Sequence, residues 1–304
     1  MNALDEVDAL EAADRLDRPD RPFYDTGVLL GSDDFRDEQT YHRSRLARAL
    51  AYLAGAGTLI GLKAEAVANE AGTEHELKVG AGLAIDRLGR LIEVPRSWCV
   101  RLEPWFLAQP ADAIRAAHGA QGVVADLFLR FTPQARGRTP SFAQGAFDAT
   151  DALVPNRVRD AFRFELILRP DARDAPATDF LPRSRFQAVR ALAPADRPDA
   201  LRDALLDGWN DATNPHARDL ARPDGEALPP LPEHGAAADD SDSLADPTSL
   251  FIARLLIPTV EAPAAVPAGT RPTPIFTALD AAHIDNTSRR FAYPADALAA
   301  VFGI

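Results

Sequence analysis

The sequence predicts an α+β protein in which a capped helix near the N-terminus packs on a small antiparallel sheet, followed by further strands, short helices and long Pro/Ala-rich loops. Three observations predict this class. Residues 32–54 repeat apolar side chains at spacings of three and four, with acids first and arginines last, as expected of an amphipathic helix. Residues 58–102 change to a loose alternation, which indicates short strands. Two apolar runs, 122–131 and 159–170, indicate stronger strands.

Length and composition are those of a folded chain with a thin core. The 304 residues suggest about two domains. Hydrophobic residues make up 46% of the chain, but alanine supplies much of that fraction and aromatic residues only 7%. Alanine buries little area, so the core should depend on scattered Leu, Ile, Val and Phe side chains. The 25 prolines crowd into the second half and predict long irregular connections there.

The charge excludes some classes of partner. A net charge of −12 argues against nonspecific nucleic-acid binding and against docking on an anionic membrane. No run of about 18 apolar residues occurs, so we expect no membrane insertion. The single cysteine, Cys99, allows neither an intrachain disulfide nor a cysteine zinc site, and its apolar neighbours predict a buried structural thiol. Residues 1–21 are acidic and lack the apolar core of a signal peptide, which predicts a flexible arm on a cytoplasmic protein.

Residues 22–103 are predicted to form the first module. Ser32, Asp33 or Asp34 can cap the helix, and glycines at 55 and 57 end it. The pattern predicts one buried stripe along the helix: Phe35, Gln39 or His42, Leu46, Leu50 and Leu53.

The sheet of this module is predicted from its turns. Residues 82–95 indicate a hairpin around the turn Asp86–Gly89, and residues 97–103 add a strand with Trp98, Val100 and Leu102 on one face.

The rest of the chain alternates between strands, helices and loops. Residues 104–209 are predicted to form a second α+β region, with a helix broken near Pro110 and one or two helices over 181–209. Between its two strands, residues 132–158 are predicted to be a long polar loop that is functional or reaches a neighbour. Residues 210–247 have little to bury and predict a mobile linker or extended arm. Residues 248–304 are predicted to contain a C-terminal strand and short helices.

No motif for catalysis is complete. Glu38 and His42 lie four apart and share a helix face, but a zincin needs a second histidine and a di-iron site a second Glu-x-x-His. We expect Glu38 to be solvated and His42 to be partly buried against a strand. The glycine-bearing segments lack a P-loop lysine, and no G-x-S-x-G elbow occurs. We therefore expect no enzyme and assign no catalytic, cofactor-binding or metal-ligating residue.

The opening block, read as a whole, matches a known pattern. An aromatic-Asp segment with two leucines, Tyr24 to Leu30, is followed by the helix motif "DFRDEQTYH" and then by the hairpin "GLAIDRLGR". A later patch, residues 156–168, has Asp160 and Phe162 where the pattern has Glu and Tyr. The block resembles poorly characterised structural, baseplate-type proteins of contractile phage tails and phage-tail-like injection systems. The resemblance covers about a third of the chain and carries no catalytic residue.

The residues that carry this resemblance form a structural signature: Tyr24, Asp34, Phe35, Glu38, Tyr41, His42, Gly61, Gly82, Asp86, Gly89 and Arg90. The resemblance implies a subunit that acts through contacts with other subunits. It also implies that multiple copies of this subunit assemble in a symmetric particle. We expect the long loops to clasp those neighbours.

Two alternatives remain open at this stage. One is a soluble hydrolase that uses Glu38 or Asp86 near His42. The other is an effector carried by such a particle.

Overall fold

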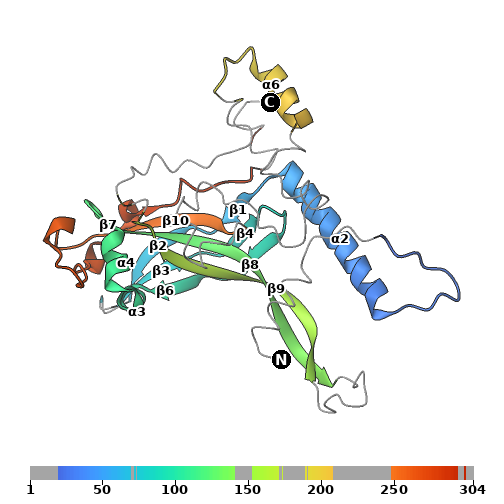
Figure 1. Ribbon diagram of the computed structural model, residues 1–304, viewed down its shortest axis with the longest axis horizontal. Coiled ribbons are helices and arrows are strands. Elements are labelled where there is room, and N and C mark those ends of the chain that lie inside the picture. The colour runs from blue at the N-terminus through green and yellow to red at the C-terminus, as the bar shows by residue number, and fades with distance from the viewer. Residues whose placement is uncertain are drawn as a thin grey trace.

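The structure is a computed structural model that describes residues 20–69, 72, 74–140, 153–170, 173, 189, 191–207, 248–293 and 298. Helices and antiparallel sheets are both present, which confirms the predicted α+β class. Figure 1 shows the strands gathered in one body, from which helix α2 (Ser32–Leu53) and the far end of the β8–β9 hairpin extend as separate arms. Residues 1–19 of the arm predicted over 1–21, the linker at 210–247 and most of the C-terminal helix lie outside the described residues.

The strands of the described residues form three sheets, and every ladder is antiparallel. The first sheet has the order β1-β4-β5, with bounds Gly57–Gly61, Gly82–Ile85 and Leu91–Val94. The second has the order β2-β3-β6, with bounds Ala64–Ala68, His75–Val79 and Trp98–Arg101. The third has the order β11-β10-β8-β7, with bounds Ile284–Asp285, Leu250–Ile257, Gly122–Pro140 and His118–Gly119, and β9 (Leu153–Leu168) also pairs with β8.

The predicted hairpin at 82–95 is confirmed as β4 and β5. The Gly89 N–H donates to the Asp86 carbonyl at 3.0 Å, and Gly89 adopts φ +84°, a conformation that strongly favours glycine. Local turn chemistry therefore sets the register of this pair.

The helix predicted to break near Pro110 is also confirmed. It forms α3 (Leu102–Ala108) and α4 (Ala111–Ala116), and Pro110 is the N-cap of α4. Phe106 of α3 and Ile114 of α4 are buried. The Trp105 indole N–H donates to the Leu166 carbonyl of β9 at 3.2 Å. The two short helices close one side of the core over β9.

One hydrophobic core joins the two regions that are predicted on either side of residue 103. Its buried side chains come from β2 to β5, from α3 and α4, from β8 and from β10. Every residue of β10 except Leu256 is buried, so this late strand is central to the fold. Within the range 181–209, where one or two helices were predicted, the described residues include α6 (Arg197–Asp207), which buries none of its residues.

The predicted loop at 132–158 is wrong in its described part. β8 continues to Pro140 and β9 begins at Leu153, and the ladder between them keeps one register from Ala125↔Leu168 to Pro140↔Leu153. Prolines at 133, 140 and 155 favour a loop on sequence grounds, but a two-stranded ribbon tolerates proline where the missing N–H faces solvent. Only residues 141–152, between these strands, lie outside the described residues.

Helix α2 forms where it is predicted, but its buried stripe is wrong. Phe35 is 50% exposed, Leu46 61% and Leu53 87%, whereas the buried residues of the helix are Ser44 and Ala47. The helix approaches the β4–β5 turn closely at Ala47: a Cβ added to Gly89 would lie 1.8 Å from the Ala47 carbonyl oxygen. Small residues therefore allow close backbone contact, and the larger apolar side chains stay outside.

The capping residue also differs from the prediction. Gly31 is the N-cap, and the Asp34 carboxylate accepts the Gly31 N–H at 2.7 Å. The cap therefore uses an acid from inside the first turn.

Candidate functional site and interaction surfaces

The signature residues of the helix lie on its N-terminal half and on the segment before it. The Tyr24 hydroxyl donates to Glu38, which fixes the extended segment against the helix. Tyr41 packs edge-on against His42, and the Arg45 guanidinium lies 5.2 Å from the Tyr41 ring. These contacts are structural.

The signature glycines mark places where two backbones nearly touch. Gly61 and Gly82 pair directly across β1 and β4. A Cβ on Gly61 would lie 2.1 Å from the Ala81 carbonyl oxygen, and one on Gly82 would lie 2.3 Å from the Ile60 carbonyl oxygen. Both positions therefore require glycine for packing.

Asp86 and Arg90 form a buried ion pair that ties the hairpin to the rest of the protein. Asp86 is fully buried and accepts the Arg90 Nε–H at 2.6 Å and the backbone N–H groups of Leu88 and Arg90 at 2.9 Å. Burial raises the pKa of Asp86, and the Arg90 charge opposes that rise. Arg90 also lies 4.5 Å from the Phe131 ring and donates to the Thr248 hydroxyl.

The candidate acid/base pair on α2 is exposed. His42 Nε2 and Glu38 Oε1 are 4.0 Å apart, and their side chains are substantially exposed. The expected partial burial of His42 is therefore wrong. Within the described ranges, no three His, Cys, Asp or Glu side chains form a group that could hold a metal ion.

Cys99 also differs from its prediction. Its side chain is exposed on β6, and burial of part of the thiol together with a hydrogen bond to Glu76 raises its pKa. A raised pKa lowers the thiolate fraction, so the thiol is a poor nucleophile.

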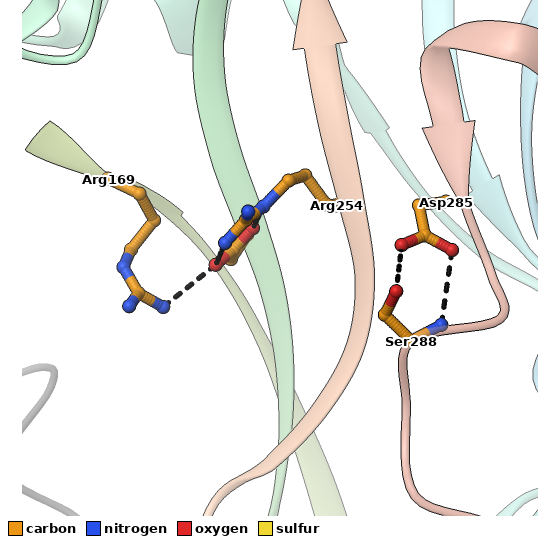
Figure 2. Close-up of polar contacts among 5 residues, drawn as sticks. Arg169, Arg254, Asp285 and Ser288 are labelled. Atoms are coloured by element: carbon orange, nitrogen blue, oxygen red, sulfur yellow. Dashed lines mark hydrogen bonds and ion pairs between the residues drawn. The ribbon is translucent and has the colours of Figure 1, made fainter. Parts of the chain in front are cut away.

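A buried cluster that the sequence reading missed joins three strands. In Figure 2, Arg169 and Arg254 point toward one carboxylate, that of Asp126. Arg169 Nη1 lies 2.7 Å from Asp126 Oδ2, and Arg254 makes a bidentate contact at 2.8 and 2.9 Å. Asp126 is in β8, Arg254 is opposite it in β10, and Arg169 follows β9. The sequence signal for this cluster is a single charged residue inside an apolar run of each of two strands, Asp126 in β8 and Arg254 in β10.

A second missed cluster fastens the C-terminal part of the chain to the first sheets. Asp285 accepts the backbone N–H and the hydroxyl of Ser288, as Figure 2 shows. Asn286 exchanges two hydrogen bonds with the backbone of Ala64, at 2.8 and 2.9 Å. Arg289 is buried and donates to the Leu62 carbonyl at 2.7 Å. Burial lowers the pKa of Arg289 to about 10, so it stays charged at neutral pH.

His118 is a buried titratable group beside β8. Its Nε2 lies 2.8 Å from the Thr259 hydroxyl, which itself donates to the Glu261 carbonyl. The network therefore assigns the Nε2–H tautomer, and Nδ1 has no hydrogen-bond partner within the described part of the chain. Burial lowers the pKa of His118, although the Glu261 carboxylate opposes this.

We expect the unfolding free energy to decrease from about pH 7 to about pH 5, because unfolded His118 takes up a proton near pH 6.5 while the folded protein resists it. Because the pKa of His118 is lower in the folded protein, its contribution to stability is fully present above the unfolded pKa and is lost as the pH falls. Urea unfolding at a series of pH values measures this decrease. His118→Gln should reduce it, and an unchanged slope in that variant would contradict the assignment.

Two exposed arms carry the remaining features. We call residues 20–38 the N-terminal arm and residues 132–140 with 153–162 the hairpin arm. The N-terminal arm exposes apolar side chains on its extended part and first helical turn: Phe23, Tyr24, Val28, Leu29, Leu30 and Phe35. Leu29 is 95% exposed. An apolar group of this kind on a protein surface is typical of a contact site.

The hairpin arm is basic. Arg136, Arg138, Arg157 and Arg159 are all exposed along it. The ladder pairs Arg136 with Arg157 and Gln134 with Arg159, so the register places the four arginines on one face of the ribbon.

Comparison of the sequence with known proteins finds no match among protein-family models and none among curated proteins. Among the described residues, no helix has the length and apolar character that a membrane span requires.

Proposed function

We propose that the chain is a structural subunit of a contractile phage-tail-like particle, at or near its baseplate, and that it acts through contacts with other subunits. The resemblance of residues 22–90 supports this, and the signature glycines, Asp34, Asp86 and Arg90 have packing, capping or ion-pair roles.

The observation that carries the proposal is the pair of arms on a well-packed body. The strands of the body share one core, whereas the N-terminal arm exposes large apolar side chains and the hairpin arm exposes four arginines. A two-stranded ribbon alone is marginally stable in water, and an exposed apolar segment is costly. Both features are explained if neighbouring subunits cover them.

The hydrolase alternative has no observation in its favour. His42 is exposed on α2, the half-buried Glu38 accepts the Tyr24 hydroxyl, and Asp86 is occupied by the N–H groups of its own turn and by Arg90. An effector carried by the particle would differ from a structural subunit in its copy number. Subunit counting in the purified particle measures that number.

Limited trypsin digestion tests the proposed role of the arms. In the isolated chain, trypsin should cut first after the exposed arginines of the hairpin arm, such as Arg157 and Arg159. In the assembled particle these sites should be protected. Mass spectrometry of the fragments identifies the sites that are cut. Equal cleavage of these sites in both states would contradict the proposal.

A further inference from the structure

The arginine face of the hairpin arm is built for an anionic partner. Arg136 and Arg157 lie directly opposite each other in the ladder, and like charges in that position destabilise a pair of strands. Arg138 and Arg159 extend the same face on either side. The described residues of this arm contain four basic residues and one acid, Asp160, on a chain whose net charge is −12. Acidic groups that approach the face would relieve this repulsion.

The same chain carries a matching acidic surface. Residues 20–38 contain six acidic and two basic residues. Asp33 and Asp37 lie four apart in α2, as do Asp34 and Glu38, so the helix presents two adjacent acidic rows. The N-terminal arm also exposes apolar side chains, which can bury area once the charges have paired.

We propose that the N-terminal arm of one copy docks on the arginine face of the hairpin arm of a second copy. This inference rests on the proposed function and specifies one of its contacts. Charge complementarity selects the second copy as the occupant, and Figure 1 shows α2 and the hairpin arm leaving the body separately. The two surfaces are different, so the contact is heterologous, and its repetition forms a ring or a filament.

Charge reversal in the full-length chain tests the contact. Arg157→Glu/Arg159→Glu reverses two of the four charges on the arginine face and replaces the repulsive pair with Arg136 by an attractive one, so it should not impair folding. Asp33→Lys/Asp37→Lys reverses two of the six acidic charges of the N-terminal arm, both at exposed positions. Each variant should weaken self-association by about tenfold or more in sedimentation velocity at low salt, because like charges then face each other. Salt should also weaken association of the unchanged chain.

The decisive result is the mixture of the two variants. Mixed together, they can place the introduced lysines of one variant against the introduced glutamates of the other, and their two unchanged arms against each other, so association should return. Arg96→Glu, an exposed reversal outside both arms, is the matched control and should associate normally. A chain that stays monomeric at all concentrations and salts, or reversals that leave association unchanged or are not rescued by mixing, would overturn the proposal.

The outcome is separable from the proposed function. If the chain occurs in the particle but does not self-associate through the arms, the inference fails and the function stands. If it self-associates and rescue works but no particle contains it, the function fails and the contact stands.

Discussion

Replacement of Asp126 by alanine should lower the free energy of unfolding by about 3–5 kcal/mol, which is the usual effect of removing one partner from a buried ion pair. The change leaves two buried guanidinium groups, Arg169 and Arg254, without the carboxylate that joins β8, β9 and β10. Urea unfolding followed by circular dichroism measures the loss.

A matched control separates burial from charge. Asp112 also pairs with an arginine, Arg115, at 3.5 Å, but its side chain is 84% exposed, so Asp112→Ala should leave stability unchanged within error. Replacement of all three buried residues by apolar side chains of similar size should recover most of the loss. A loss below about 1 kcal/mol for Asp126→Ala would show that the cluster is not a central support.

Gly89→Ala should cost about 2–4 kcal/mol, because two penalties combine. Gly89 has φ +84°, which costs a residue with a Cβ about 1–2 kcal/mol, and the new methyl group would lie 1.8 Å from the Ala47 carbonyl oxygen. The contact between α2 and the hairpin must therefore open. Trypsin cleavage within α2, measured beside the unfolding curve, should become faster.

Gly269→Ala isolates the steric contribution. Gly269 has φ +74°, but a Cβ there meets no atom within 4 Å, so only the backbone penalty applies. Equal losses in the two variants would contradict a role for Gly89 in holding α2.

Short-range features of this fold could be predicted from the sequence. The β4–β5 hairpin depends on its own turn, and the break between α3 and α4 depends on Pro110. Strand β10 is signalled by an apolar run too short for a typical helix. In each case the cause lies within a few residues of the effect.

Other features depend on contacts that periodicity does not report. The stripe on α2 correctly predicts a helix, but the pattern does not say which surface covers it, and only Ser44 and Ala47 are buried. Prolines at 133 and 155 mask the extension of β8 and β9, because their cost depends on whether a third strand needs the missing N–H. Asp126 pairs with arginines that are 43 and 128 residues away. A lone acid in an apolar strand signals a partner without identifying it.

The signature residues illustrate the same division. Gly61, Gly82 and Gly89 could be predicted as turn or bulge positions, yet the structure explains them by close approach to Ala81, Ile60 and Ala47. Glu38 and His42 share a helix face, as their spacing predicts, but their exposure could not be read from spacing.

Subunit counting in the purified particle tests the central claim most directly. A tail-like particle would be isolated from cells that produce this chain, and its proteins would be quantified by mass spectrometry against the tube and sheath subunits. We predict that the chain is present in a fixed copy number that matches the symmetry of the particle. Absence from the particle, or an amount that varies between preparations, would contradict the account.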